Sequence, residues 1–273
     1  MKVLTIVATV TVVLAISSTA SATTVIGFDA AAYRPSNDGT LEFGTATEYV
    51  TEDGMFASTP KAGQKTLYGT EYFDGWSLSD IGNIQYTCKR VEGVARPYTN
   101  AVITDGSGHY GVISSQGGTQ LGSTVVVGTI EVEGVTKNVI EEHYRFDFAD
   151  NSGNQLYGFR FYEPNPDSWS GQPAWWGSGV NIVWSDISSW DLLGIGDTRP
   201  LNSGEAALGY PRGPVDHGLS IVWGDSANNY LGDMDIYDVT VYDALGEDYV
   251  AGVPEPATMA LLALGGLLIR RKK

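Results

Sequence analysis

The stretch His143-Tyr144-Arg145-Phe146-Asp147-Phe148, followed by Leu156-Tyr157-Gly158-Phe159-Arg160-Phe161-Tyr162, decides the fold class of this 273-residue chain. In both segments aromatic side chains alternate with polar ones, which is the period of a strand with one buried face and one solvated face. Asp150-Asn151-Ser152-Gly153 lies between them and consists of residues that favour turns. The pattern predicts a β-hairpin and, with it, a β-rich domain.

Shorter segments rich in Val, Ile, Thr, Tyr and Trp recur along the rest of the chain, separated by turn residues. We expect strands at Thr24–Phe28, Gly39–Phe43, Ile84–Cys88, Val102–Thr104, His109–Ser114, Ser123–Glu133, Val180–Trp184, Leu219–Trp223 and Ile236–Tyr242. The segment Gly179–Asp186 is repeated as Gly218–Asp225, which we interpret as two equivalent strands. Helical turns near Asp186–Leu193 or Ser203–Leu208 would be short. The sequence therefore predicts an all-β fold, a single β-sandwich of the jelly-roll or concanavalin/lectin-like type.

The N-terminus has the pattern of a secretory signal peptide. Lys2 supplies a positive charge, Val3–Ile16 is apolar, and Ala20-Ser21-Ala22 provides small residues at the cleavage positions. We expect residues 1–22 to be removed and Thr23 to begin the mature protein.

The C-terminus has a second, tripartite pattern. Pro254-Glu255-Pro256 stays extended because neither proline fits inside a helix. The apolar stretch Ala257–Ile269 is predicted to form a short helix, and Arg270, Arg271 and the two terminal lysines resist translocation. Such a helix is about 20 Å long, against about 30 Å of hydrocarbon, so it suits a transient anchor better than a permanent one.

These three elements, in this order, resemble the PEP-CTERM sorting signal of bacterial exported proteins. The resemblance implies that Pro254, Glu255, Pro256, Arg270 and Arg271 form the sorting motif. It also implies recognition and cleavage by the membrane protease exosortase, transient residence in the inner membrane, and final delivery to the cell surface or the medium. Residues 253–273 are accordingly assigned to the sorting signal and residues 23–252 to the β-sandwich domain.

The domain that remains is strongly acidic. It carries eleven Lys and Arg residues and thirty-one Asp and Glu residues, a net charge near −20. Such a charge disfavours nucleic acid as a partner and favours solubility and cations. Cys88 is the only cysteine, so no internal disulfide can form, and we expect it to be buried and inert.

A loop rich in Pro and Gly concentrates tryptophans, among them Trp169, Trp175 and Trp176. Such a loop has difficulty burying three indoles, so these rings are candidates for stacking on the sugars of an extracellular polysaccharide. Burial in the core is the alternative for each of them.

An aspartate-rich segment, Asp233-Met234-Asp235-Ile236-Tyr237-Asp238, leads into the last predicted strand. It resembles the strand entry of carbohydrate-binding jelly rolls and concanavalin-like domains, which implies a structural Ca²⁺ held by Asp233, Asp235 and Asp238. A solvated acidic edge is the alternative. The same segment resembles the acidic strand of concanavalin-like retaining glycosidases, although its outer acids are Asp where that family has Glu.

Other catalytic patterns do not appear. His109, His143 and His217 form no zinc-like pair, and no Gly-x-Ser-x-Gly elbow accompanies them. We expect His143 to lie on a sheet surface. The sequence therefore favours a non-enzymatic envelope or extracellular-matrix protein with a structural or carbohydrate-binding role. A secreted glycoside hydrolase-like enzyme is the alternative.

The two terminal patterns predict a defined mature polypeptide. Mass spectrometry of the protein from its host should find Thr23 at the N-terminus and a C-terminus that has lost Arg270 to Lys273. An intact basic tail on the exported protein would contradict the processing prediction.

Overall fold

The computed structural model describes residues 23–38, 40, 42–49, 54–106, 110–115, 119–148, 159–162, 184–193, 218–224 and 231–252. The predicted signal peptide, the predicted sorting signal 253–273 and the tryptophans Trp169, Trp175 and Trp176 lie outside these residues. The domain boundaries therefore stay predictions.

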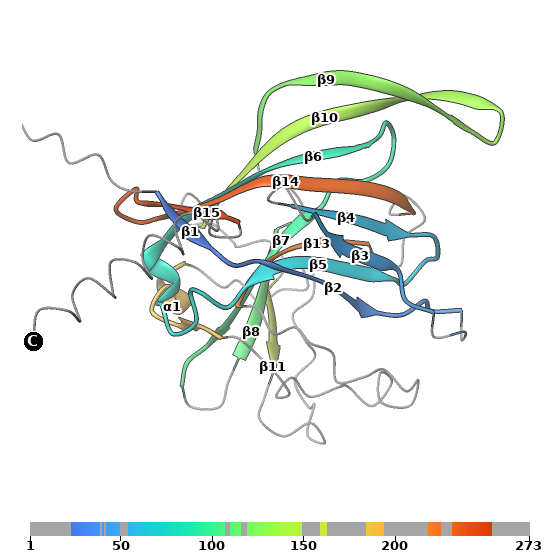
Figure 1. Cartoon of the computed structure of the whole chain (residues 1–273). Coiled ribbons are helices and arrows are strands. Elements are labelled where there is room, and N and C mark those ends of the chain that lie inside the picture. Colours follow the sequence, from blue (N-terminus) through green and yellow to red (C-terminus); the bar gives the residue numbers. More distant parts are fainter. Residues whose placement is uncertain are drawn as a thin grey trace, which may run out of the picture.

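The described residues form two β-sheets, which confirms the predicted all-β class and is consistent with a β-sandwich (Figure 1). The eight strands of sheet A are β1 (Thr24–Ile26), β3 (Thr45–Glu48), β4 (Gly54–Thr59), β6 (Ile81–Val91), β9 (Thr119–Val132), β10 (Val135–Asp147), β14 (Gly232–Asp243) and β15 (Asp248–Ala251). The seven strands of sheet B are β2 (Asp29–Arg34), β5 (Lys65–Thr70), β7 (Tyr98–Thr104), β8 (Tyr110–Ser115), β11 (Phe159–Tyr162), β12 (Asp191–Leu192) and β13 (Leu219–Trp223). Helical structure in these ranges is limited to the 3₁₀ turn η1 (Leu78–Asp80) and the single turn α1 (Trp184–Ile187).

Strand β14 organises sheet A. One of its edges pairs antiparallel with β6, and its other edge pairs first with β4 and then with β15. The change of partner coincides with a β-bulge between Tyr237 and Thr240, where Asp238 adopts a φ of 52°. Because a bulge adds one residue and bends the strand, the same edge of β14 can pair with β4 before the bulge and with β15 after it. Beyond β6, the sheet continues through β10 to β9.

The main core lies between the two sheets. Strand β14 contributes Met234, Ile236, Val239 and Val241, all at most 1% exposed, and Trp223 of β13 is the largest fully buried side chain among the described residues. The regular alternation on each side of the bulge places these residues on one face of sheet A. Packing of two such inner faces is what holds a sandwich together.

The outer faces of the two sheets differ. On sheet B, a second apolar cluster of Tyr33, Leu67, Tyr98, Val102 and Val222 is buried on the face opposite the main core. Strands β5 and β13 are consequently buried on both faces. The outer face of sheet A carries polar and charged side chains that reach solvent, and it is there that a ligand can approach.

The predicted hairpin is wrong. His143–Asp147 belongs to β10, whose two edges are taken by β6 and β9, so Tyr144 lies between Tyr86 and Gln120. Phe159–Tyr162 is β11 and pairs with β8 in the other sheet. The alternating pattern identified two strands, and β10 has the predicted buried face, but the pattern contained no information about which strand each one pairs with.

Other predictions failed locally. Six of the described strands were not predicted: β2 to β5, β12 and β15. The sequences of β2 to β5 are alanine-rich, glycine-containing or Thr/Ser-rich and lack a run of large apolar residues. Phe43 forms only an isolated bridge with Pro35 instead of a strand. Trp184 begins helix α1, whereas its counterpart Trp223 ends strand β13, so the two repeats differ at this tryptophan, and residues 180–183 lie outside the described part of the chain. The predictions of a buried Cys88 and a surface His143 are confirmed.

A buried ion pair joins β6 to β10 on the inner side of sheet A. Arg90 contacts Glu142 at 2.6 Å, and their side chains are 12% and 6% exposed. Thr124 donates a hydrogen bond of 2.8 Å to the other carboxylate oxygen, and the Tyr144 hydroxyl also donates to Glu142. Burial alone would raise the pKa of Glu142, but the hydrogen bonds from Tyr144, Thr124 and Arg90 and the charge of Arg90 outweigh it and lower that pKa.

We predict that Glu142→Gln destabilises the protein by about 3 kcal/mol at pH 7, because it leaves the Arg90 charge buried without its counter-ion. Since the folded-state pKa is lowered, this stabilisation is present above the unfolded pKa of about 4.3 and is lost as the pH falls through the folded value. Urea unfolding at several pH values measures both effects. The control Glu71→Gln removes an exposed carboxylate and should change stability by less than about 0.5 kcal/mol. A Glu142→Gln penalty that persists undiminished in acid would contradict the assignment.

Candidate functional site

A row of charged side chains crosses the outer face of sheet A. The strand register aligns Asp235 of β14 with Lys89 of β6, and Lys89 with Glu141 of β10. Lys89 Nζ lies 3.3 Å from an Asp235 carboxylate oxygen. The cation thus separates two carboxylates that would otherwise face each other, an arrangement favoured in cross-strand pairs.

Two tyrosines border this row. Tyr237 lies two residues after Asp235, so both project from the same face of β14, and its hydroxyl donates to Glu141. Tyr49, which follows β3, donates its hydroxyl to Asp235. Burial, followed by the hydrogen bond and charge of Glu141 and by the charges of Asp238 and Asp235, raises the pKa of Tyr237 well above its usual range. Its phenol therefore stays protonated and keeps donating.

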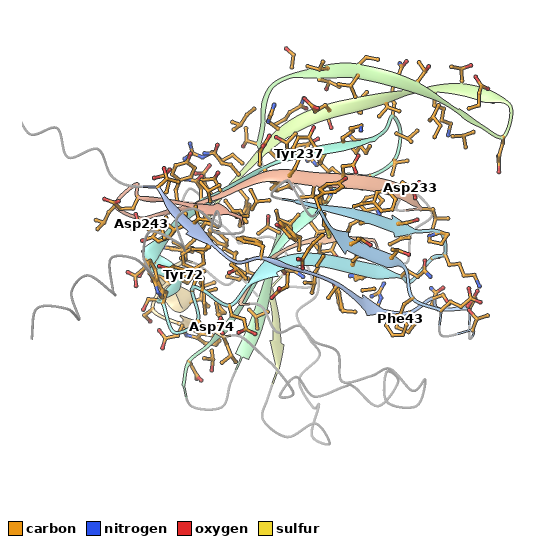
Figure 2. The ribbon with its side chains drawn as sticks, viewed as in Figure 1. Phe43, Tyr72, Asp74, Asp233, Tyr237 and Asp243 are labelled. Atoms are coloured by element: carbon orange, nitrogen blue, oxygen red, sulfur yellow. The ribbon has the colours of Figure 1, made fainter. Side chains whose placement is uncertain are left out.

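These five side chains and Val127 of β9 line a hollow of about 370 Å³, which we call the sheet A hollow. Figure 2 shows Tyr237 on the outer side of β14, beneath the β9–β10 hairpin. The volume is within the range of small-molecule sites, and the lining combines aromatic faces with a few placed polar groups. Carboxylates accept hydrogen bonds, the ammonium donates them, and the rings offer flat apolar faces. Such a lining fits a ligand with many hydroxyl groups.

The structure separates the three aspartates that were predicted to act together. Asp235 lies in the sheet A hollow. Asp233 accepts a hydrogen bond of 2.7 Å from Ser58 Oγ on one side of β14, and Asp238 accepts one of 3.2 Å from Thr87 Oγ1 on the other. Among the described residues, no group of three His, Cys, Asp or Glu side chains is placed to hold a metal ion. The calcium site stays a prediction that this geometry does not support.

The positions of Asp233 and Asp238 on β14 also bear on the glycosidase alternative. Asp233 and Asp238 are five residues apart on one strand, which corresponds to about 16 Å. A retaining pair of carboxyl groups needs a separation of about 5–5.5 Å. The two side chains accept hydrogen bonds from opposite neighbouring strands, Asp233 from Ser58 of β4 and Asp238 from Thr87 of β6, so the enzyme alternative stays a prediction.

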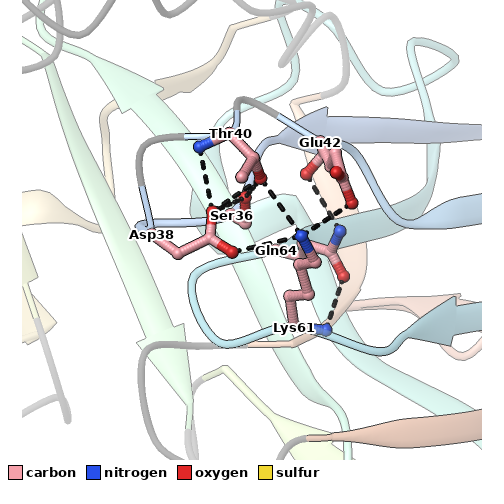
Figure 3. A network of polar contacts seen from close by, with 6 residues as sticks. All are labelled: Ser36, Asp38, Thr40, Glu42, Lys61 and Gln64. Atoms are coloured by element: carbon pink, nitrogen blue, oxygen red, sulfur yellow. Dashed lines mark hydrogen bonds and ion pairs between the residues drawn. The ribbon is translucent and has the colours of Figure 1, made fainter.

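A second polar cluster, shown in Figure 3, ties the turn after β2 to the turn before β5. Lys61 Nζ lies 3.1 Å from Asp38 and 2.8 Å from Glu42. Hydrogen bonds from Thr40, in first place, and from Ser36 lower the pKa of Asp38. Because these ion pairs and hydrogen bonds tie two turns together, we interpret the cluster as a clamp on the chain.

An aromatic cluster lies where β15 returns beside β1. The rings of Phe73, Trp76 and Tyr249 stack edge to face with centroids 5.2–5.7 Å apart, and Tyr72, which is 47% exposed, covers them. Phe73 is fully buried, so the cluster is anchored in the core. The cluster closes one end of the sandwich. Its exposed ring, Tyr72, is a tyrosine that does not line the hollow and can serve as a control for those that do.

Sequence reasoning found one of the six residues that line the hollow. Asp235 was singled out, but Tyr49, Lys89, Val127, Glu141 and Tyr237 were not. The Asp-x-Tyr spacing on β14 could have identified Tyr237 as a neighbour of Asp235 on the same face. The others come from strands whose order in the sheet only the fold determines. The predicted stacking residues Trp169, Trp175 and Trp176 lie outside the described residues.

The C-terminal pattern is recognised by comparison with known families. Residues 252–273 match the family model of the PEP-CTERM protein-sorting motif, so the chain carries this sorting signal. No curated protein and no solved structure matches the chain. In the part of the chain that the structure describes, no helix is both long enough and apolar enough to cross a membrane; Ala257–Ile269 lies outside that part.

The separate partners of Asp233, Asp235 and Asp238 predict that a chelator leaves the protein's thermal stability unchanged. A calcium ion bound at 100 times its Kd would contribute about 2.7 kcal/mol, and its removal would lower the Tm by several degrees. Differential scanning calorimetry with EDTA and with added CaCl₂ makes the comparison. A drop of that size with EDTA, reversed by CaCl₂, would restore the calcium hypothesis.

Proposed function

We propose that this protein, which its PEP-CTERM signal marks for export and for sorting by exosortase, is a non-catalytic surface protein that binds carbohydrate in the sheet A hollow. The observation that carries the proposal is the lining of the hollow, with Tyr49 and Tyr237 beside Asp235, Lys89 and Glu141. Donors, acceptors and aromatic faces are all present within one open depression on an accessible sheet face.

The negative charge of the protein indicates whether the carbohydrate ligand is neutral or anionic. The whole chain has a formal net charge of −16, and two of the five polar or aromatic residues in the hollow are carboxylates. An acidic surface of this kind repels anionic polymers at low ionic strength. We therefore favour a neutral polysaccharide of the extracellular matrix as the ligand.

The hollow's interactions also favour binding over catalysis. Asp235 accepts from Tyr49 and pairs with Lys89, and Glu141 accepts from Tyr237. Side chains held in this way are ordered before a ligand arrives, so less entropy is lost on binding. The alternative, a secreted glycoside hydrolase-like enzyme, gains no support from the positions of Asp233 and Asp238.

The proposal predicts that Tyr237→Ala weakens binding to neutral polysaccharides by about tenfold, the effect of losing an aromatic contact worth about 1.4 kcal/mol. Affinity electrophoresis or a glycan array on the exported protein measures it. Tyr72→Ala is the matched control, because it removes an exposed tyrosine far from the hollow in the sequence and in a different cluster. Equal binding by wild type and Tyr237→Ala would remove the hollow as the binding site.

The tryptophan loop is tested in parallel by the double variant Trp175→Ala/Trp176→Ala. If binding falls in this variant and not in Tyr237→Ala, the protein binds carbohydrate through the loop and the hollow has another role. Absence of binding to any neutral polysaccharide by the wild-type protein would leave only the structural role.

A further inference from the structure

We propose that the outer edge of β9 pairs antiparallel with the same edge of a second copy of this chain, so that two sandwiches share one continuous sheet about a twofold axis near Ile130. This inference does not depend on the sheet A hollow or on its ligand. It rests on the pairing, the exposure and the charge of the β9–β10 hairpin.

Strand β9 is the last strand of sheet A. Among the described strands it pairs only with β10, through the register that runs from Val132 opposite Val135 to Thr119 opposite Arg145. Its other edge presents backbone N–H and C=O groups over fourteen residues, a length of about 45 Å. Figure 1 shows this hairpin at the rim of the sheet, extending away from the remaining strands.

The outer part of the hairpin is exposed on both faces. Val125, Val126, Val127, Ile130 and Val135 are between 43% and 58% exposed, although each is an apolar β-branched residue. An isolated two-stranded ribbon is at best marginally stable in water, because it buries too little to offset the entropy lost on ordering. A partner strand beside β9 that covers the exposed side chains of β9 itself would supply the missing burial.

The part of β9 that pairs regularly with β10 is the part whose outer edge a partner strand can use. Register shifts opposite Val139–Ile140 and Glu141–His143 bend β9 nearer the body, and bulges of this kind protect an edge. From Gly128 to Val132 the pairing is uninterrupted. The turn that follows, Glu133-Gly134 with φ values of 51° and 75°, has the positive angles of a tight hairpin turn and so prolongs the ribbon without fraying.

Charge selects a second copy as the occupant. β9 has a single charged residue, Glu131, whereas β14 has four aspartates. Two copies of so acidic a protein repel each other over most of their surfaces, but their β9 edges do not. Pairing centred on Ile130 places Glu131 opposite Thr129 and Glu133 opposite Val127 of the other copy, so no like charges face each other directly.

The hairpin extends beyond the rest of its sheet, and this reduces the repulsion between the two acidic sandwiches. Pairing between β10 and β6 ends at Val139 with Val91, and Asn138 is still bound to Glu92, so the three residues from Val135 to Lys137 extend about 10 Å further. Dimerisation through this part keeps the acidic bodies apart by more than the Debye length of about 8 Å at physiological ionic strength. An isologous twofold contact also closes on itself and does not lead to fibres.

Sedimentation velocity of the exported protein over a range of concentrations tests the proposal. We expect a monomer–dimer equilibrium that strengthens with NaCl, since salt screens the repulsion between the bodies. Ile130→Glu should raise the dimer Kd by about tenfold or more, because it sets two like charges opposite each other at the axis. Ile130 faces Lys137 within the hairpin, so the new carboxylate has a cation across the strand pair and the fold is preserved.

Val135→Glu is the matched control. It adds the same charge to the same hairpin at a residue that is 58% exposed, but on the strand away from the free edge, and it should change the dimer Kd by less than about twofold. Monomer alone at every concentration, or equal effects of the two substitutions, would overturn the proposal. A dimer unaffected by both would place the contact elsewhere and overturn it as well.

Cross-linking gives a second measurement. Residues opposite each other in an antiparallel pair have Cβ atoms about 4.5–5.5 Å apart, close to disulfide geometry, so Ile130→Cys should form a disulfide-linked dimer under mild oxidation. Val135→Cys should not. Cys88 does not compete, because it is buried and burial raises its pKa to about 12. Equal cross-linking of both variants would indicate random collision and contradict the twofold contact.

Discussion

The pairing of β14 with β6 on one edge and with β4 and β15 on the other is the constraint on which the rest of the structure depends. It fixes which side chains of β14 enter the core and which face solvent. Met234 and Ile236 then pack against sheet B, and Asp235 and Tyr237 project outward. A slip of one residue would exchange the two sets and bury the carboxylates, so the register is strongly specified.

The bulge at Asp238 belongs to the same constraint. A regular strand through residues 232–243 would put Asp238 on the inner face, since it lies two residues after Ile236. The extra residue turns Asp238 outward, where it accepts a hydrogen bond from Thr87, and returns Val239 and Val241 to the core. The positive φ of Asp238 therefore lets the strand keep a carboxylate outside and two valines inside, which regular alternation would not allow.

The hollow and the free edge lie on the same sheet for a related reason. Both faces of β5 and β13 in sheet B are buried, whereas the outer face of sheet A carries exposed side chains such as His143. On sheet A, Val127 of β9 lines the hollow, and Ile130, three residues further, lies on the exposed ribbon. A dimer through β9 would set two hollows on one continuous sheet, which would increase the avidity for a repeating polymer.

The sequence by itself determined the all-β class, the buried and solvated faces of individual strands such as His143–Asp147, and the sorting signal, because period-two alternation and the tail motif are local properties. Only the tertiary structure decided which strands are neighbours. It placed β10 between β6 and β9, brought Lys89 and Glu141 beside Asp235, and gave Trp184 and Trp223 different secondary structures. At the second site Gly224 adopts a φ of 100°, which Ser185, the equivalent residue at the first, could adopt only with strain. Strand order depends on contacts between residues far apart in the chain, and no local pattern specifies them.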